Sequence, residues 1–405
     1  MGAMRRSVLA LAMAASVGAR ADGAFPTGMS VLLPPALPQR ILVGTTFGLV
    51  ISEDAGTTWR YVCEGHLTGS LANVLVYQAA SNGEVIAAHQ DNLSRSDDLC
   101  VWTRASGAMS GLIVVDAFIA PTNPDSVLAI GWPARAGASL FPSSNGGRSF
   151  GAPLISSGVP PLGSEERLLS VEIAAVDASV VYATTSALPT GSSPGSSALL
   201  RSADGGASWT RFDLAVDPAA EVKIAQVDPA DANIVYLRVS ANGADSIWIT
   251  TDGGAHAQPL LSTASTLGGF VRASDGALYA GTSAGDFYVR VPGATAFDKV
   301  PGPHLQCLGE RAGHVYACGI GSVDGYDLAT SDDRGKSFRK LLSFTQIVGP
   351  STCPSVQSAC AADFAQLQRT LSVPVANCSC GQRSGGIAEL LILFALLAWR
   401  RKARP

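Results

Sequence analysis

A short motif, Ser-x-Asp-x-Gly-x-x-aromatic, recurs along the chain and constrains its fold more than any other feature. Four copies are clear, one of them with Asn in place of Asp. Their signature residues are Ser52, Asp54, Gly56 and Trp59; Ser143, Asn145, Gly147 and Phe150; Ser202, Asp204, Gly206 and Trp209; and Ser331, Asp333, Gly335 and Phe338. A motif repeated at a regular period is typical of architectures built from stacked or ring-shaped repeats.

Three weaker copies fill the intervals between the clear ones. The segment 96–102 is one residue short and has Cys100 near the glycine position. The next weak copy keeps Asp252 and Gly254 but lacks the final aromatic, and the segment 290–297 keeps little beyond Phe297. The seven copies then follow one another at a mean spacing of about 46 residues, which is the length of one four-stranded propeller blade.

The residues between the motifs agree with this period. A segment rich in β-branched and aromatic residues precedes each copy, at 40–44, 84–88, 127–130, 180–184, 234–238, 278–281 and 315–319. Seven such units predict an all-β fold, a seven-bladed β-propeller of four-stranded blades, whose closure into a ring removes free sheet edges. We expect Ser30–Leu33 and Phe344–Val348 to provide the terminal strand that pairs with the first or last blade to close the ring.

The motif residues suit a hairpin between the third and fourth strands of a blade. The Ser or Thr hydroxyl and the Asp carboxylate can accept hydrogen bonds from backbone amides of the turn. Glycine tolerates the positive φ that such a turn needs, and the aromatic side chain can pack into the blade. We therefore interpret the aspartates as structural residues rather than catalytic acids, which is the alternative.

This pattern resembles the Asp-box family, also called bacterial neuraminidase repeats, over roughly residues 30–345. The family includes sialidases, two-propeller xyloglucanases, sortilin-type receptors and a photosystem assembly factor. The resemblance implies the propeller fold and says little about activity, because unrelated functions share such folds.

Both ends of the chain are special segments. Residues 1–21 are typical of a signal peptide, with Arg5 and Arg6, an apolar run and Ala19-Arg20-Ala21 before the cleavage point. The alternative is a buried N-terminal helix. At the other end, 384–405 contains a short apolar segment, interrupted by Glu389, and a basic end. As a helix this segment would be shorter than the ~30 Å hydrocarbon layer of a membrane.

The tail carries a second resemblance. Cys378 and Cys380 precede the apolar segment and the cluster Arg400-Arg401-Lys402. This arrangement resembles the myxobacterial C-terminal sorting tail, which implies cleavage near the cysteines and display on the cell surface. The alternative is a plain membrane anchor. The sequence thus divides into a signal peptide at 1–21, a propeller at 22–350, a disulfide-containing extension and sorting linker at 351–383, and the helix with its basic tail at 384–405.

Charge and cysteine content narrow the class of protein. Without the basic ends, the chain carries 21 Lys and Arg against 31 Asp and Glu, a net charge of −10. Such a surface disfavours nucleic acid and anionic lipid as partners. No Cys or His spacing fits a zinc site, and we expect no metal, no cofactor and a monomer.

Eight cysteines in an exported chain predict disulfides. Cys63 follows the first motif and Cys100 lies in the second, so this pair could join neighbouring blades. Cys307 and Cys318 flank one turn, and we expect them to pair. Cys353 and Cys360 bracket a short segment and form the third predicted pair. Six cysteines allow fifteen pairings, so the connectivity is a hypothesis.

The ligand face of such a propeller lies opposite the turn motifs. The loops predicted there carry the candidate ligand residues Glu64, His66, Trp132, Arg135, Asp245, Asp286, Asp324 and Tyr326, together with Glu165-Glu166-Arg167. The Gly/Ser/Pro-rich segment 188–197 is an insertion on the same face, which is most simply a solvated loop.

Three classes of function remain open. A sialidase needs three converging arginines, a Tyr/Glu nucleophile pair and an acid, and the arginine-containing motif that usually opens its propeller is lacking here. A xyloglucanase-type enzyme places two carboxylates across two propellers, and the sequence fits one. We therefore favour a surface-displayed, non-catalytic module that binds a glycan or a protein. A glycoside hydrolase, and an envelope protein or assembly factor for a partner complex, are the alternatives.

Overall fold

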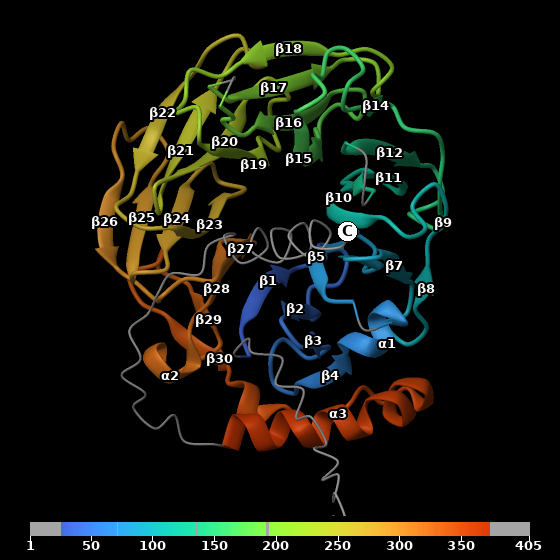
Figure 1. Cartoon of the computed structure of the whole chain (residues 1–405). Helices are drawn as coiled ribbons and strands as arrows, with labels where there is room; N and C mark the ends of the chain where they lie inside the picture. The colour runs from blue at the N-terminus through green and yellow to red at the C-terminus, as the bar shows by residue number, and fades with distance from the viewer. Residues whose placement is uncertain (1–25, 71, 134–136, 192–193, 373–405) are drawn as a thin grey trace, which may run out of the picture.

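The protein is a seven-bladed β-propeller, as the sequence predicts. The computed structural model describes residues 26–372, except 71, 134–136 and 192–193. In this part of the chain seven four-stranded antiparallel sheets are arranged around a common axis (Figure 1). Each blade is built from strands in chain order, innermost strand first.

The strands of the first four blades have the following bounds. Blade 1 contains β1 (Gly28–Leu32), β2 (Ile41–Thr45), β3 (Gly48–Ser52) and β4 (Arg60–Cys63). Blade 2 contains β5 (Val74–Ala79), β6 (Val85–His89), β7 (Asn92–Ser96) and β8 (Thr103–Arg104). Blade 3 contains β10 (Ile113–Ala120), β11 (Asn123–Trp132), β12 (Ser139–Ser143) and β14 (Ile155–Ser156). Blade 4 contains β15 (Arg167–Ile173), β16 (Val181–Ala187), β17 (Ser196–Ser202) and β18 (Thr210–Asp213).

The remaining elements complete the ring. Blade 5 contains β19 (Glu221–Val227), β20 (Val235–Ala241), β21 (Ala244–Thr250) and β22 (Ala257–Ser262). Blade 6 contains β23 (Leu267–Arg272), β24 (Leu278–Thr282), β25 (Asp286–Arg290) and β26 (Asp298–Pro301). Blade 7 contains β27 (Cys307–Arg311), β28 (His314–Cys318), β29 (Leu328–Ser331) and β30 (Arg339–Leu342). Outside the blades lie β9 (Ser106–Gly107), β13 (Ser149–Phe150), α1 (Glu64–Thr68), α2 (Gly321–Asp324), the 3-10 helix η1 (Phe344–Gln346) and α3 (Pro354–Ser372).

The repeated motif forms the hairpin between the third and fourth strands. In blade 4 the Ser202 hydroxyl donates to Asp204 Oδ1 (2.7 Å) and accepts from the Gly206 amide (2.8 Å). Asp204 Oδ1 in turn accepts from the Ser208 amide (2.8 Å), and Trp209 donates to the Gly206 carbonyl (3.0 Å). Hydrogen bonds from Ser208 and Ser202 lower the pKa of the Asp204 carboxyl to about 2. The polar side chains of this turn are thus occupied in holding it.

The weaker copies occupy the same place in their blades. In blade 2 the shortened turn keeps its carboxylate, and Asp98 Oδ1 accepts from the amides of Cys100 (2.8 Å) and Val101 (2.9 Å). Leu99 takes the positive φ of 61° that glycine takes elsewhere. In blade 6 residues 291–297 connect β25 to β26. The blade period predicted from seven copies is therefore present in the structure.

Polar side chains of the innermost strands link several blades to the next one. Asp116 Oδ2 accepts from the Val171 amide (2.8 Å), and the Ser170 hydroxyl accepts from the Ile224 amide (2.8 Å). Two residues after Ser170, Glu172 Oε1 accepts from the Val227 amide (3.0 Å). In the next blade, Gln226 Oε1 accepts in the same way from the Arg272 amide (2.7 Å). Innermost strands lack a partner strand on one side, so these bonds satisfy amides that a buried edge would otherwise leave unpaired.

A C-terminal segment pairs with blade 1, as expected, but the bounds predicted for the two closing segments were wrong. Ser30 and Val31 lie in β1, the ordinary innermost strand of blade 1, and pair with β2. Phe344 begins η1 rather than a strand. The segment that adds to blade 1 is 348–351, which lies along the outer edge of β4 in parallel orientation, with a bridge between Tyr61 and Pro350.

The disulfides connect blades 1 and 2 to the C-terminal segment, so two predicted pairs are wrong. Cys63 pairs with Cys360 and Cys100 with Cys353, whereas Cys307–Cys318 is paired as expected. The physical reason is α3, which the sequence analysis did not predict. Seven residues of helix separate two side chains by about 10 Å, beyond the ~7 Å Cα–Cα limit for a disulfide, so Cys353 and Cys360 cannot pair with each other.

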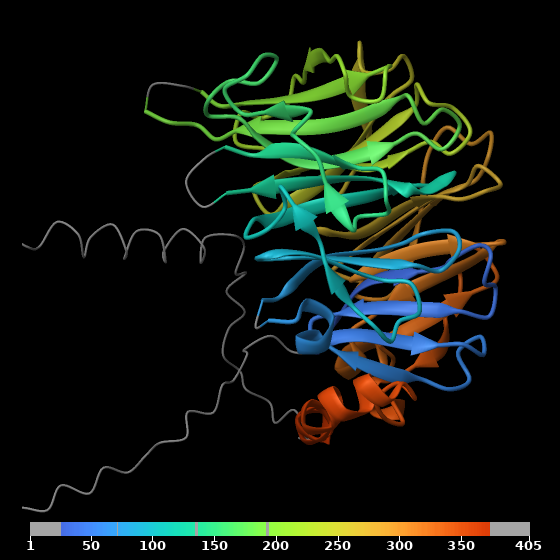
Figure 2. The same cartoon turned by 90° about the vertical axis from the view of Figure 1, so that its right-hand side faces the viewer.

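The helix α3 packs against the outside of the ring beside β4 (Figures 1 and 2). Its buried face consists of Val356, Cys360 and Leu367, and Phe364 lies 6.1 Å from Tyr61 between ring centroids. No helix within the described residues is long and apolar enough to cross a membrane. The predicted signal peptide, the sorting cysteines Cys378 and Cys380, and the apolar segment at 384–405 lie outside the described residues.

Candidate functional site

The candidate ligand residues lie in connections on one face of the propeller. The connections between consecutive blades and those between second and third strands leave on the same side, opposite the turn motifs. Both α1, which follows β4, and α2, between β28 and β29, face the viewer in Figure 1 and lie at the left in Figure 2. We call this side the loop face.

On the loop face of blade 1, α1 carries two of the candidates. Glu64 Oε1 accepts a short hydrogen bond (2.6 Å) from the Val74 amide at the start of blade 2. His66 Nε2 lies 2.9 Å from the Cys100 carbonyl oxygen. Both polar groups therefore connect α1 to blade 2.

Blade 3 provides an aromatic side chain on this face. The Trp132 indole donates to the Leu168 carbonyl (3.2 Å) on blade 4, and the Arg167 guanidinium lies 5.7 Å from the centroid of its ring. Arg167 is exposed and Trp132 is half-buried, so the stacked pair forms a partly accessible surface. Arg135 lies outside the described residues.

In the acidic segment before β15, Glu166 forms an ion pair. Glu166 is buried, and its carboxylate binds the Arg211 guanidinium in two-pronged fashion, at 2.6 Å and 2.8 Å. The same carboxylate accepts from the Gly163 amide (2.8 Å). This arrangement fixes the connection between blades 3 and 4 against β18.

The carboxylates of blades 5 and 6 are also paired. Asp245 is 3% exposed, and its Oδ2 binds Arg238 (2.6 Å) and accepts from the Leu267 amide (2.6 Å) of the next blade. Asp286 forms an ion pair with Lys299 (2.9 Å), which lies on the neighbouring strand of its own blade.

Blade 7 brings two candidates together. Asp324, in α2, binds His304 Nδ1 (2.9 Å) and accepts from the Ile320 amide (2.7 Å). Burial raises the pKa of the Tyr326 hydroxyl to about 12, and the charge of Asp324 adds to this effect. Asp324 with Tyr326, like Trp132 with Arg167, is a pair of predicted candidates that the structure brings together.

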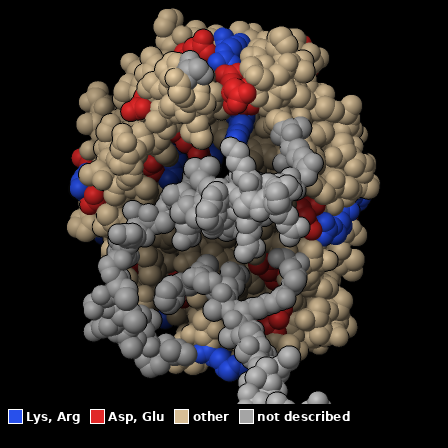
Figure 3. Space-filling view, viewed as in Figure 1, with Lys and Arg blue, Asp and Glu red and all other residues tan. Residues whose placement is uncertain are grey.

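The candidates therefore do not converge on one point. They come from six blades. Five of the carboxylates have a partner that maintains the local structure, namely Glu64, Glu166, Asp245, Asp286 and Asp324, whereas Glu165 is exposed. Figure 3 shows the same pattern at the surface: Lys and Arg lie in small mixed groups with Asp and Glu, separated by uncharged residues. A catalytic acid and base would instead face a common substrate position.

One constellation that the sequence analysis missed has the contacts of a catalytic triad. In blade 2, His89 Nδ1 lies 2.6 Å from Asp91 Oδ1, and His89 Nε2 lies 3.0 Å from the Ser94 hydroxyl. Burial holds the pKa of the His89 imidazole below its ordinary value, against the effect of Asp91. The signal was the spacing His-x-Asp-x-x-Ser across one hairpin.

Access distinguishes this constellation from an active site. Both His89 and Ser94 are fully buried, so no substrate carbonyl could reach the Ser94 oxygen. Nucleophilic catalysis needs the reacting atoms about 3 Å apart in a productive geometry. The network therefore holds the β6–β7 hairpin rather than a substrate.

Two further carboxylates have strongly raised pKa values. Burial raises the pKa of Asp116 to about 7 and that of Glu172 to about 8. Perturbed acids of this kind occur at functional sites, and structural networks produce them as well. Here both carboxylates accept amides of the next blade, which assigns them to the inter-blade bonds described above.

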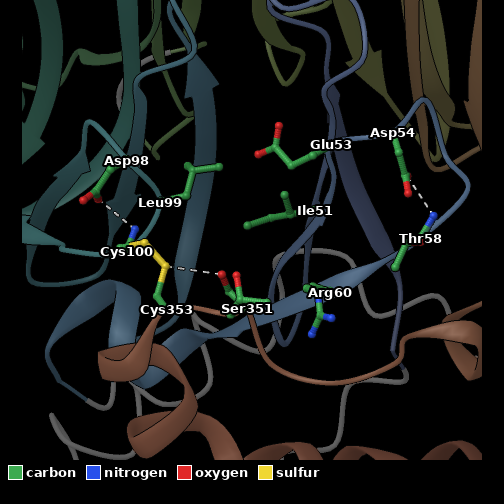
Figure 4. A pocket seen from close by; sticks show the side chains of 11 residues that line it. Ile51, Glu53, Asp54, Thr58, Arg60, Asp98, Leu99, Cys100, Ser351 and Cys353 are labelled. Carbon is green, nitrogen blue, oxygen red and sulfur yellow. Dashed lines mark hydrogen bonds between the residues drawn. A yellow bond between two sulfur atoms is a disulfide. The ribbon is translucent and has the colours of Figure 1, made fainter.

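A cavity of about 390 Å³ lies at the rim of blades 1 and 2, on the side of the turn motifs (Figure 4). It is bounded by Glu53, Asp54, Arg60 and Asp98 and by the Cys100–Cys353 disulfide. Asp54 and Asp98 already accept amides of their own turns, and Glu53 pairs with Arg40 (2.9 Å). Within the described residues no group of three or more His, Cys, Asp or Glu side chains could hold a metal ion.

Comparisons with known proteins show likeness in fold at low sequence identity. No family model matches the chain, and no curated protein matches it. A GH74 xyloglucanase from Xanthomonas campestris is similar at 15% identity and a TM-score of 0.29, covering 77% of this chain and 68% of that one. A GH74 enzyme from Niastella koreensis is similar at 14% and 0.31, covering 76% and 61%.

Other solved structures show similar values. An ancestral GH74 enzyme is 15% identical with a TM-score of 0.41, and the matched region covers 78% of this chain and 38% of that chain. A luciferin-regenerating enzyme is 12% identical with a TM-score of 0.42, covering 62% and 86%. The fold assignment rests on the strand topology itself, and these values leave activity open.

Proposed function

We propose that this protein is an exported propeller that binds a glycan or protein partner through its loop face and has no catalytic activity. The observation that carries the proposal is the use of the polar residues on that face. Glu64, Glu166, Asp245 and Asp324 each accept bonds that hold neighbouring segments together. A carboxylate committed to such bonds is poorly placed to exchange protons with a substrate.

The loop face offers groups suited to contact instead. Leu188, between β16 and β17, is 57% exposed, and Val323, in α2, is 59% exposed. With the half-buried Trp132 under Arg167, they are separate apolar and aromatic side chains on blades 3, 4 and 7. Aromatic and apolar anchors surrounded by polar groups are typical of binding surfaces.

The compartment is consistent with this proposal. Three disulfides indicate an extracellular or otherwise oxidising environment. From the sequence alone, we propose that the segment 1–21 directs export. We also propose that the tail beginning near Cys378 leads to display on the cell surface.

A binding experiment on the purified propeller tests the proposed function. A glycan array and a pull-down from envelope extract would be run with the wild type, with Trp132→Ala, and with Val323→Glu. Val176 is the matched control, because it is equally exposed (55%) but lies between β15 and β16 on the opposite face. We expect the loop-face variants to lose the captured ligand and Val176→Glu to retain it. Equal binding by all variants, or release of reducing sugar ends from a bound glycan, would contradict the proposal.

The proposed display is tested separately on whole cells. Changing both Cys378 and Cys380 to Ser should abolish surface staining by an antibody against the propeller, because the proposed processing site is lost. Unchanged staining, with the segment 400–404 still present on the mature protein, would favour the plain membrane anchor.

A further inference from the structure

Blades 1 and 7 meet where the two ends of the propeller come together. Blade 1 consists of the first four strands and blade 7 of the last four, and within the described residues no strand is shared between them. β1 packs beside β27, and the Arg311 guanidinium of blade 7 donates to the carbonyls of Arg40 (2.9 Å) and Pro38 (2.7 Å). We call this contact the junction. If only side-chain contacts held blades 1 and 7 together, the ring would open most easily at this junction.

The chain that leaves blade 7 crosses this junction and pairs with blade 1. The Val348 amide donates to the Trp59 carbonyl (3.0 Å), the Tyr61 amide to the Gly349 carbonyl (3.0 Å), and the Ser351 amide to the Tyr61 carbonyl (2.8 Å). Residues 348–351 thus continue the sheet of blade 1 outward from β4. The last segment of the chain has become part of the first blade.

Two disulfides then make the crossing covalent. Cys353, directly before α3, is bonded to Cys100 in the turn of blade 2, and Cys360, in α3, is bonded to Cys63 at the end of β4. The bonded residues are 253 and 297 positions apart, so each bond spans most of the ring. Figure 4 shows Cys353 beside Ser351, against the turn of blade 2 that contains Asp98 and Leu99. The third disulfide, Cys307–Cys318, differs because it lies within blade 7, with a separation of 11.

Packing supports the covalent bonds. Cys63 and Cys360 are buried together, and Val356 and Leu367 of α3 are buried in the same cluster. An aromatic row joins the elements of both blades: Phe344 contacts Phe47 edge-on at 5.0 Å between centroids, Phe47 lies 5.8 Å from Tyr61, and Tyr61 lies beside Phe364. α3 is therefore a fixed part of the ring.

We propose that residues 348–372 form a covalent clasp that keeps the ring closed at the junction and carries a pull on the carboxyl end of the chain into blades 1 and 2. A pull at Ser372 reaches Cys360 and Cys353 before it reaches β30, the outermost strand of blade 7. Without the bonds, the same pull would detach 348–351 and then peel β30, which among the described strands pairs with β29 alone. The mechanical role of the clasp rests on the proposed attachment of the chain through its tail. Its role in keeping the ring closed does not depend on that attachment.

Hydrogen exchange tests whether the clasp closes the junction. The variant with Cys63, Cys100, Cys353 and Cys360 all changed to Ser would be compared with the wild type and with Cys307→Ser/Cys318→Ser, each as the mature full chain. In the four-site variant we expect amides of β30 and 348–351 to exchange at least about ten-fold faster, with blades 3 to 5 unchanged. The control should leave 348–351 at the wild-type rate. Equal acceleration in all blades, or none at the junction, would overturn the proposal.

A second measurement keeps the test decisive if the four-site variant does not fold. The two pairs would then be removed singly, as Cys63→Ser/Cys360→Ser and as Cys100→Ser/Cys353→Ser. Each variant would be pulled between its chain ends in an optical trap. The intact protein should release only the chain from Gly28 to Cys63 and from Cys360 onward. Loss of the Cys63–Cys360 bond should extend the released chain to Cys100 and Cys353 and lower the force of the first opening event. An unchanged first opening force would show that the bonds carry no load. Because this assay contains no ligand and no cells, its failure is distinguishable from failure of the proposed binding or display.

Discussion

At the scale of single residues, the buried hydroxyl that opens each turn motif is a sensitive point. Ser202 is 1% exposed and accepts from the Gly206 amide while donating to Asp204. Ser202→Ala should destabilise the protein by about 1–2 kcal/mol, because the buried amide loses its acceptor. Ser208→Ala is the comparison: the Ser208 hydroxyl also donates to Asp204, but it is exposed, so its replacement should cost less than about 1 kcal/mol. Urea denaturation measures both, and equal effects would show that the hydroxyl has no special role.

The aromatic position of the motif should vary between blades. Trp59 is 2% exposed, whereas Trp209 is only half-buried, although both donate to the carbonyl of their motif glycine. Trp59→Ala should cost about 3–5 kcal/mol by opening a cavity. Trp209→Ala should cost clearly less, since less apolar surface returns to water. Thermal unfolding of the two variants compares them, and the reverse order would contradict this interpretation.

A titrating residue gives the fold a pH dependence. Burial raises the pKa of Glu172 to about 8 in the folded protein, from 4.5. Folding then takes up a proton between these values, so this group stabilises the protein below about pH 4.5, and that contribution is lost as the pH rises through 8. Glu172→Gln should keep the bond to the Val227 amide, as Gln226 does in the next blade, and should remove the titration. The stability of the variant relative to wild type should increase from pH 5 to pH 8.5, by at most about 5 kcal/mol. A constant difference across this range would contradict the assignment.

At the scale of elements, the connection between blades 3 and 4 depends on one ion pair. Glu166 is buried, binds Arg211 on β18 through both oxygens and accepts from Gly163, whereas Asp213, which also binds Arg211, is exposed. Glu166→Gln should cost about 1–3 kcal/mol, because Arg211 loses its buried partner. Asp213→Asn should cost less than about 1 kcal/mol, as exposed pairs do. Limited proteolysis should show faster cleavage in 157–166 for the first variant only. Unchanged cleavage there would mean that other contacts hold the connection.

The elements that the sequence predicts well are those set by local patterns. The segments at 127–130 and 278–281 lie in β11 and β24, and 180–184 overlaps the start of β16, because short runs of β-branched and aromatic residues between turns specify strands locally. The turn at 96–102 was recognised despite its missing residue because Asp98 keeps its role. Such features need no knowledge of distant contacts.

The pairing of the cysteines could not be predicted in the same way, because it depends on α3. The spacing of Val356, Cys360, Phe364 and Leu367 is helical, but this short pattern is weak beside the strand period that dominates the chain. Once 354–372 is a helix, Cys360 cannot reach Cys353, so each of the two must bond to a cysteine elsewhere in the chain. The positions of Glu64, Asp245 and Asp324 on one face follow from the blade period, but their partners do not. The Leu267 amide and His304 reach Asp245 and Asp324 through tertiary packing, so the expected clustering of a site could be judged only in the structure.

At the scale of the whole molecule, folding and compartment are coupled. The bonds Cys63–Cys360 and Cys100–Cys353 join blades 1 and 2 to a segment that follows blade 7, so the chain can form them only when the ring has nearly closed. In a reducing compartment the ring would have to close through packing and the backbone bonds of 348–351 alone. In a chain-entropy view, bonds that span most of a chain constrain its unfolded state the most.

Expression without residues 1–21 therefore gives a test at this scale. We expect the exported protein to show no reaction of the six propeller cysteines with an alkylating reagent after denaturation. The protein retained in the cytoplasm should react at all six, because a reducing environment keeps thiols unbonded. The retained protein should also unfold at a lower temperature, since removal of a native disulfide typically costs about 2–5 kcal/mol. Oxidation of the purified, retained protein with glutathione should restore the melting temperature if its ring is already closed, because each thiol then lies beside its partner. Restoration only after complete unfolding would show that the ring stays open without the bonds. If the two preparations were equally stable before oxidation, the disulfides would not be what holds this propeller together.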